Sequence, residues 1–315
     1  MMIYRSIVFL VIIGMICCSP KPEEAASEQS SEIVSESEEV PQSTHPVWSP
    51  DGQRIAFINN KTGVSNNNAI NFEVFTTNAD GSNILQHTHN TAFESEIAWS
   101  PDGNALSFKS YRDGNDEIYI LDLISGEEKN ITKSPRREGS PEWSKDGSLI
   151  YFQSDRDIES GELYSYNVRT EVILRLTDND FNEIGATWSP DGLRIAFTSN
   201  QDGDDDIYIM DVSGDNLIQV TNNELMDWSP RWSPDARKIL FTYGDWNTEI
   251  FELRLIDLEL KTEETILKEV DSGNATWNPS GTKIAFGSPK SGSGEIYILN
   301  MSTKTEIKIT SNDNF

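Results

Sequence analysis

The stretch Trp188-Ser189-Pro190-Asp191-Gly192 decides the fold of this chain, because it recurs six times with small changes. The copies begin at Trp48, Trp99, Trp143, Trp188, Trp232 and Trp277. Successive tryptophans are 51, 44, 45, 44 and 45 residues apart. A period of roughly 40–45 residues, filled with strand-forming sequence, is typical of the blades of a β-propeller.

Each copy has the residues of a tight hairpin. Pro190 presets φ at the first central position of a turn, the Asp191 side chain can bond the nearby backbone, and Gly192 supplies the positive φ that a bulge needs. The hairpin accounts for the recurring aspartates, so we do not interpret them as a ligand site. We expect the tryptophans to pack between blades.

Two more features mark the following strands. Five or six residues after each turn an aromatic residue lies in an apolar run, and these residues are Phe57, Phe108, Phe152, Phe197, Phe241 and Phe286. A polar loop then leads to an acid, an aliphatic and an aromatic residue, such as Asp206-Ile207-Tyr208, and a short last strand often ends in threonine. Four strands in each of six units predict an all-β, six-bladed β-propeller of four-stranded antiparallel blades.

Residues 1–18 are expected to be a signal peptide. Arg5 precedes an apolar run from Ile7 to Ile16, which is too short to span a bilayer comfortably, and the two cysteines of the chain follow. A cysteine at this place resembles the acylation site of bacterial lipoproteins. Cys18 is the predicted lipidation site, and Ser19 after it resembles a signal for sorting to the outer membrane. An ordinary secretory signal with incidental cysteines is the alternative.

Residues 19–45 are predicted to be a disordered acidic tether, and residues 46–315 to be the propeller. The tether has seven acids, one lysine and no aromatic residue, so it cannot bury enough apolar surface to offset the entropy of ordering. The last unit is complete at Thr310, which leaves no strand over to complete the first unit. Residues 31–40 are a candidate outer strand for that purpose.

The chain is strongly acidic, with a formal charge of −27. The repeat region carries most of this charge, which argues against nucleic acid or an anionic membrane surface as a partner. The charge serves solubility, or alternatively it attracts cations or a basic partner surface. We expect a monomeric propeller that meets the membrane only through its lipid anchor.

The repeats resemble those of the TolB propeller family. The resemblance covers about residues 46–310 and is clearest from Gly185 through Trp188-Ser189-Pro190-Asp191-Gly192 and Phe197 to Asp211. It implies the fold and a place among proteins of the bacterial envelope. TolB carries a further α/β domain before its propeller and works in the Tol–Pal system, whereas here the short tether stands in that domain's place. Similar repeats also accompany hydrolase domains in prolyl-oligopeptidase-like enzymes.

Sequence motifs for catalysis are scarce. No Gly-x-Ser-x-Gly occurs, so the nucleophile elbow of an α/β-hydrolase is missing. The three histidines are His45, His87 and His89, and the last two have the spacing of a pair on one strand face. Such a pair can supply two metal ligands, but it is more often exposed on an outer strand. The sequence therefore indicates no enzyme.

Binding residues are expected in the loops after the second and fourth strands of each unit, which emerge on one face of a propeller. The first unit has an enlarged loop at residues 59–71, and the fifth unit places Trp246 in the corresponding loop. Loops that enter later units hold Phe93, Arg136, Arg137, Phe181, Met226 and Trp228. Aromatic and arginine residues on such loops are typical of binding sites, although some can instead pack beneath the loops.

An acid lies five residues before the tryptophan in four units: Glu94, Glu138, Glu183 and Asp227. Each would begin an innermost strand near the mouth of the central channel. A ring of carboxylates there can hold a divalent cation such as calcium, and no other cofactor is indicated. The alternative is that these acids accept hydrogen bonds from loop backbone amides.

Together these features predict an exported binding module of the cell envelope, anchored as an outer-membrane lipoprotein and facing the periplasm or the cell surface. Its loop face would contact a protein or glycan partner. The alternatives are a scaffold without a ligand, and an enzyme with its site at the channel mouth, acting on a glycan or lactone and metal-dependent.

Overall fold

The computed structural model describes residues 42–60, 71–157, 161–178, 183–248, 250–271, 275–291 and 294–311, all of which belong to the compact unit Val40–Phe315. The predicted signal peptide with Cys18, and the tether up to residue 41, lie outside the described residues. None of the described residues forms a helix long and apolar enough to cross a membrane.

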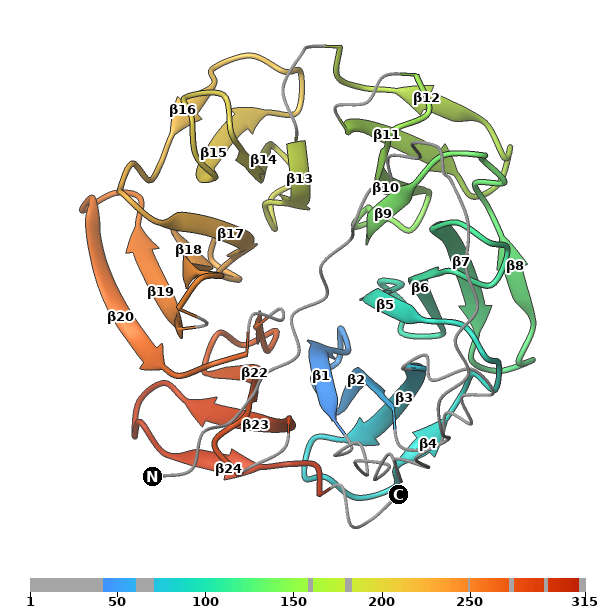
Figure 1. Cartoon of the computed structure of the whole chain (residues 1–315), viewed down its shortest axis with the longest axis horizontal. Helices are drawn as coiled ribbons and strands as arrows, with labels where there is room; N and C mark the ends of the chain where they lie inside the picture. The colour runs from blue at the N-terminus through green and yellow to red at the C-terminus, as the bar shows by residue number, and fades with distance from the viewer. Residues whose placement is uncertain are drawn as a thin grey trace, which may run out of the picture. The chain divides into compact units, whose positions relative to one another are not determined.

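The described residues form six four-stranded antiparallel sheets, which follow one another in a ring (Figure 1). The first strand of each sheet lies innermost and the fourth outermost. The strands of blades 1 to 3 are β1 (Ser43–Trp48), β2 (Arg54–Asn59), β3 (Glu73–Asn78), β4 (Leu85–Gln86), β5 (Glu94–Trp99), β6 (Ala105–Ser110), β7 (Glu117–Asp122), β8 (Glu128–Asn130), β9 (Glu138–Trp143), β10 (Leu149–Ser154), β11 (Glu162–Asn167) and β12 (Ile173–Arg175). Those of blades 4 to 6 are β13 (Glu183–Trp188), β14 (Arg194–Ser199), β15 (Asp206–Asp211), β16 (Ile218–Gln219), β17 (Met226–Trp232), β18 (Lys238–Asp245), β19 (Ile250–Asp257), β20 (Thr262–Lys268), β21 (Thr276–Trp277), β22 (Lys283–Ser288), β23 (Glu295–Asn300) and β24 (Glu306–Lys308). The predicted six-bladed propeller is confirmed.

The recurring turn joins the first two strands of each blade through its serine and aspartate. In blade 4, Ser189 Oγ donates to Asp191 Oδ1 at 2.5 Å and accepts from the backbone N–H of Arg194 at 2.9 Å. Gly192 follows at a φ of 74°. These bonds occupy the aspartate inside the turn, which confirms its interpretation as part of the hairpin.

The acid of the recurring triplet and the threonine that ends the fourth strand bind each other. In blade 4, Thr221 Oγ1 donates to Asp206 Oδ1 at 2.9 Å and accepts from the backbone N–H of Ile207 at 2.9 Å. Blade 6 repeats the pattern with Thr310 and Glu295, at 2.6 Å. This contact holds the end of the outermost strand on the third strand, and it satisfies an acid that the core would otherwise bury alone.

The tryptophans of the repeat pack between adjacent blades, as predicted. Trp99 is 6% exposed, and its Nε1 donates to the carbonyl of Val47 in the preceding blade at 3.0 Å. The guanidinium of Arg54, also in the preceding blade, lies 4.6 Å from the centre of the Trp99 ring. Trp232 repeats this arrangement with Thr187 and Arg194. Trp188 differs, because it is half-buried and stacks on Tyr151 at 4.0 Å.

The ring closes without a shared strand, since β1 to β4 and β21 to β24 each form a complete sheet. The seam between blades 1 and 6 is an apolar cluster that includes Trp48, Phe57 and Ile298. Thr44 Oγ1 also donates to Asp271 at 2.6 Å. The first strand begins at Ser43, three residues earlier than predicted, because Ser43 and Thr44 pair with β2. The candidate strand at residues 31–40 lies outside the described residues.

A reciprocal pair of substitutions tests the turn. Ala236 holds in blade 5 the position that Gly192 holds in blade 4, and both have a left-handed φ, of 58° and 74°. We expect Ala236→Gly to raise the free energy of unfolding by about 0.5–1 kcal/mol and Gly192→Ala to lower it by about 1 kcal/mol or more, because a Cβ is disfavoured at that φ. Urea unfolding measures both. If both substitutions raised the free energy of unfolding, or both lowered it, the shared turn geometry would be contradicted.

Candidate functional site

Each of the first five innermost strands is bulged by a residue in the left-handed conformation, always three positions before the tryptophan. These residues are His45, Glu96, Ser140, Gly185 and Ser229, with φ between 50° and 63°. The strand register shifts at the same place in all five blades. The equivalent residue of blade 6, Asn274, lies outside the described residues.

Four of these five residues are not glycine, and a side chain in the left-handed region costs roughly 1–2 kcal/mol. Glycine would serve the backbone equally well, as Gly185 does in blade 4. Strain that a structure retains at equivalent positions points to a use for the side chains held there. The side chains therefore mark the candidate site.

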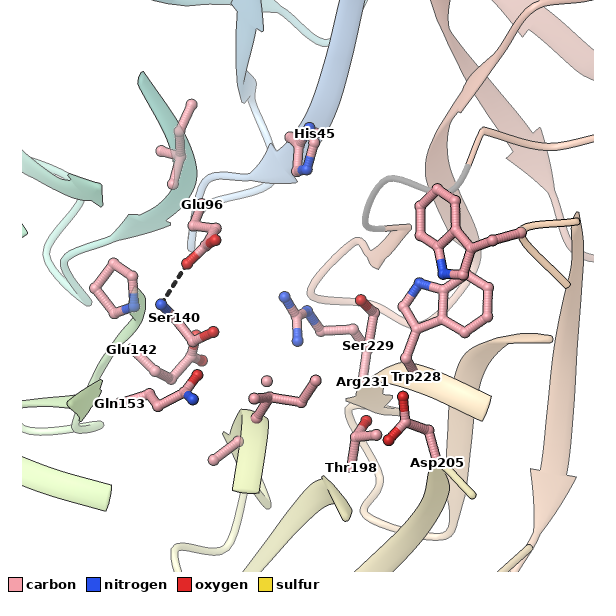
Figure 2. Close-up of a pocket in the computed structure, with 16 residues that line it drawn as sticks. His45, Glu96, Ser140, Glu142, Gln153, Thr198, Asp205, Trp228, Ser229 and Arg231 are labelled. Atoms are coloured by element: carbon pink, nitrogen blue, oxygen red, sulfur yellow. Dashed lines mark hydrogen bonds between the residues drawn. The ribbon is translucent and has the colours of Figure 1, made fainter. Parts of the chain in front are cut away.

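All five bulge residues line one pocket at the centre of the ring, with a volume of about 340 Å³ (Figure 2). Polar and charged side chains dominate its inner part, where Glu142 and Arg231 join the bulge residues. Trp228, Trp246 and Asp205 also line the pocket, and Figure 2 shows Trp228 and Asp205 on the side away from Glu96 and Glu142. The loops that carry Asp205 and Trp246 follow second strands, so the pocket opens on the face predicted for binding.

The carboxylate of Glu96 is bound within the structure. Lys109 Nζ lies 2.5 Å from Glu96 Oε1, and the backbone N–H of Ser140 donates to Oε2 (Figure 2). Although burial acts in the opposite direction, Lys109 holds the pKa of Glu96 below its ordinary value. Glu96 is therefore an anion that ties blades 2 and 3 together at the pocket wall.

Glu142 and Arg231 form a looser pair. The charge of Arg231 acts to lower the pKa of Glu142, and the charge of Glu142 acts to raise the pKa of Arg231. However, no ion pair within 4 Å joins Arg231 to any described carboxylate. Arg231 Nη1 donates to the carbonyl of Pro230 at 2.9 Å, and the Glu142 carboxylate has no hydrogen bond in the described part of the chain. Burial raises the pKa of Glu142. Both groups retain hydrogen-bonding capacity that a ligand could use.

His45 presents an imidazole to the pocket from β1. Burial lowers the pKa of His45, against the opposing field of Asp271, so the ring is neutral at pH 7. Its Nδ1 is buried and has no hydrogen-bond partner among the described residues. Because buried polar atoms are nearly always paired, this nitrogen is a second group available to a ligand.

The structure brings together two of the predicted binding residues. The rings of Trp228 and Trp246 stack with their centres 5.7 Å apart, and Phe251 meets both of them edge-on. Trp246 is 55% exposed, whereas Trp228 is half-buried and packs against the core of blades 5 and 6. The pair forms an aromatic wall at the pocket.

The other predicted binding residues do not line this pocket. Phe93 is 43% exposed and packs edge-on against Phe72, while Met226 is half-buried at the start of β17. Arg136 and Arg137 are exposed, and Arg137 pairs with Asp155 at 3.1 Å. Phe181 lies outside the described residues.

The four acids before the tryptophans begin the innermost strands, as predicted, and each is buried. Glu94 pairs with Arg112, and Glu138 with Arg156 at 3.0 Å. Asn223 donates to Asp227 at 2.5 Å. Glu183 is buried at the start of β13. The alternative interpretation expected backbone amides of the loops to donate hydrogen bonds to these acids. It is wrong for Glu94, Glu138 and Asp227, because the groups that bind their carboxylates are side chains.

These four carboxylates also do not converge on a common point. Within the described ranges, one set of three side chains lies close enough to share an ion. It consists of Asp202, Asp204 and Asp206, whose oxygens lie within 4.8 Å of one another. Gln219 donates to both Asp202 and Asp206 there. His87 is bonded to Thr76 at 2.8 Å and His89 is exposed, so neither joins such a set. Calcium binding stays a prediction.

Sequence reasoning missed His45, Glu142 and Arg231 as members of one site. A signal for two of them was present. The residue directly before the tryptophan is small or apolar in four blades, namely Val47, Ala98, Thr187 and Thr276, but charged at Glu142 and Arg231. An exception to a repeat pattern at a position facing the channel marks a functional residue better than the pattern itself.

The comparisons with known proteins agree with this fold. A family model described as the TolB beta propeller domain matches residues 28–180 and 158–315. A TolB homolog of Chlorobium chlorochromatii is 30% identical over 151 residues, which cover 47% of this chain and 31% of the homolog. An uncharacterized peptidase of Bacillus subtilis, YuxL, is 27% identical over 210 residues, which cover 53% of this chain and 32% of YuxL. The matches thus span about a third of the length of these curated relatives.

A solved structure shows the same arrangement of blades. TolB from Acinetobacter baumannii superposes with a TM-score of 0.71 at 19% identity, over 82% of this chain and 64% of that one. At this level of identity the likeness shows the fold alone.

The pH dependence of stability tests the buried acid Asp227. Burial raises the pKa of Asp227 from 3.8 to about 7, so the folded state holds the proton more tightly than the unfolded chain does. The contribution of this group to the free energy of unfolding therefore falls as pH rises from about 4 to about 7. The asparagine in Asp227→Asn cannot ionise. We therefore expect the free energy of unfolding of this variant, measured in urea, to rise relative to that of the wild type over that pH range.

Asp191→Asn is the matched control with the opposite sign. The hydrogen bond from Ser189 lowers the pKa of Asp191, so ionised Asp191 stabilises the fold above pH 4. Because the pKa of Asp191 in the folded state lies below 3.8, this variant should lose stability relative to the wild type only as pH rises to about 4, and the difference should stay constant from pH 4 to pH 7. A difference between Asp227→Asn and the wild type that is constant with pH would contradict the buried state of Asp227.

Proposed function

Because the chain belongs to the family of TolB beta propeller domains, we propose that it is a binding module of the bacterial cell envelope whose loop face receives a segment of a protein partner. The single observation that carries this proposal is the stacked pair of Trp228 and Trp246 beside the polar central pocket. An exposed aromatic wall next to a concave site is typical of the central anchor of an interface.

The energetics of the site favour binding. Trp246 places a large apolar surface in contact with water, which a partner would bury at a gain of roughly 25 cal/mol per Å². Its position is fixed by Trp228 and Phe251, so little side-chain entropy is lost on association. His45 Nδ1 and the Glu142 carboxylate, which have no hydrogen-bond partner among the described residues, then offer specific hydrogen bonds in the same pocket.

A second candidate function is an enzyme with its site in the same pocket, and one observation favours it. His45 has a lowered pKa and Glu142 a raised pKa, and both face the cavity. Shifted pKa values of titratable groups in a cavity are typical of the acid and base residues of active sites. Turnover of a glycan or lactone that is lost in Glu142→Gln, with partner capture retained, would favour the enzyme.

The proposed place of the protein is the outer membrane, held by a lipid on Cys18. The support is the position of Cys18 directly after an apolar segment and before a polar tether. We expect Cys18→Ala to leave the membrane fraction and to lose labelling by a fatty-acid analogue, with Cys17→Ala as the matched control that keeps both. A Cys18→Ala protein that stays membrane-bound and labelled would refute this site.

Trp246→Ala tests the binding proposal. Trp246 is exposed, so we expect the change to leave the free energy of unfolding within about 1 kcal/mol and to weaken partner capture about 30-fold, as truncation of a central anchor does. The measurement is affinity capture from solubilised envelopes, followed by urea unfolding of the same protein.

Two variants control this experiment. Ile124→Ala truncates a side chain that is 80% exposed in the turn between β7 and β8, on the opposite face, and should leave capture unchanged. Trp99→Ala removes a tryptophan buried between blades and should cost about 3–5 kcal/mol of stability. If Trp246→Ala captures the partner as well as the wild type does, the loop face at this pocket is not the interface.

A further inference from the structure

The carboxylates that line the central pocket are not equally compensated. Glu96 is paired with Lys109, and the charge of Glu142 is offset by that of Arg231. Asp205 has no ion pair within 4 Å and its carboxylate accepts no hydrogen bond within the described ranges. Burial, and then the neighbouring charge of Asp204, raise the pKa of Asp205. The pocket thus holds one carboxylate that the described protein leaves without a cation.

Asp205 is held beside the aromatic wall. The backbone N–H of Asp227 donates to the carbonyl of Asp205 at 2.7 Å, and Trp228 directly follows Asp227. Both Asp205 and the two tryptophans line the pocket, and Figure 2 shows Asp205 on the side where Trp228 lies. A carboxylate next to indole faces is a favourable environment for a cation, because the ring quadrupole attracts positive charge.

The surroundings strengthen the negative potential at this place. Asp202 and Asp204 lie in the same loop as Asp205, between β14 and β15, and Asp206 begins β15. The chain as a whole carries a formal charge of −27. Fields of this kind steer cationic groups toward a cleft and repel anions.

Arg231 limits how deep a cation can go. Its guanidinium extends into the cavity toward the side where Glu96 and Glu142 lie, so the inner end of the pocket already holds a positive charge (Figure 2). A volume of about 340 Å³ is ample for one long side chain. The site therefore suits a single cation on a flexible stem that lies along the aromatic wall.

We propose that Asp205, Trp228 and Trp246 bind a basic side chain, arginine or lysine, that the partner segment inserts into the central pocket. This inference rests on the proposed function and names the chemistry by which the partner is recognised. The stem of the side chain packs on Trp246, and its cation pairs with Asp205.

The test uses two small probes that differ only in charge, the amides of acetyl-arginine and of acetyl-citrulline. Titration of the propeller with acetyl-arginine amide should give a saturable change in tryptophan fluorescence, and the citrulline analogue should bind about tenfold more weakly. Asp205→Asn should abolish this preference. Asp204→Asn, which removes an adjacent acid that does not line the pocket, should keep it.

Three results would overturn the proposal: equal affinity for the two probes, no saturable change with either, or a preference that survives in Asp205→Asn. A preference lost equally in Asp204→Asn would also overturn it, because the loop's general charge would then suffice. Loss of partner capture in Trp246→Ala, together with no preference for acetyl-arginine amide, leaves the proposed function standing and refutes this inference alone.

Discussion

The bulge in each innermost strand is the constraint on which the rest of this structure depends. A strand of regular pleat would point alternate side chains into neighbouring blades and into the channel without a break. The left-handed residue three positions before the tryptophan resets that alternation. The last part of the strand can then bury its tryptophan against the preceding blade, while the bulge residue itself lines the central pocket.

Packing and function are thereby separated along a single strand. Stability comes from the outer parts of each blade, where Phe197 stacks on Tyr208 and the triplet acid binds the terminal threonine. The channel side contributes little apolar burial and instead holds His45, Glu142 and Arg231. Since the ring also closes by packing alone, the channel positions are free to vary from blade to blade.

The sequence predicts the blades well because every blade needs the same turn and the same inter-blade tryptophan. It predicts Trp228 and Trp246 as binding residues because aromatic side chains in loops depart from the repeat. It does not predict the pocket, because residues of five blades meet there and their sequence neighbours are ordinary strand residues. The acids Glu94, Glu138 and Asp227 mislead for the opposite reason: they recur in the sequence, but each pairs with a side chain near it and the three do not share a site.

The central claim is that the two serines among the bulge residues, Ser140 and Ser229, are retained for the pocket and not for stability. The most direct measurement is the free energy of unfolding of the double variant Ser140→Gly, Ser229→Gly, since both serines are left-handed and Gly185 shows that glycine fits this place. The account predicts a variant more stable than the wild type by about 0.5–1 kcal/mol per site. A loss of stability would contradict it, because the serine side chains would then serve the fold.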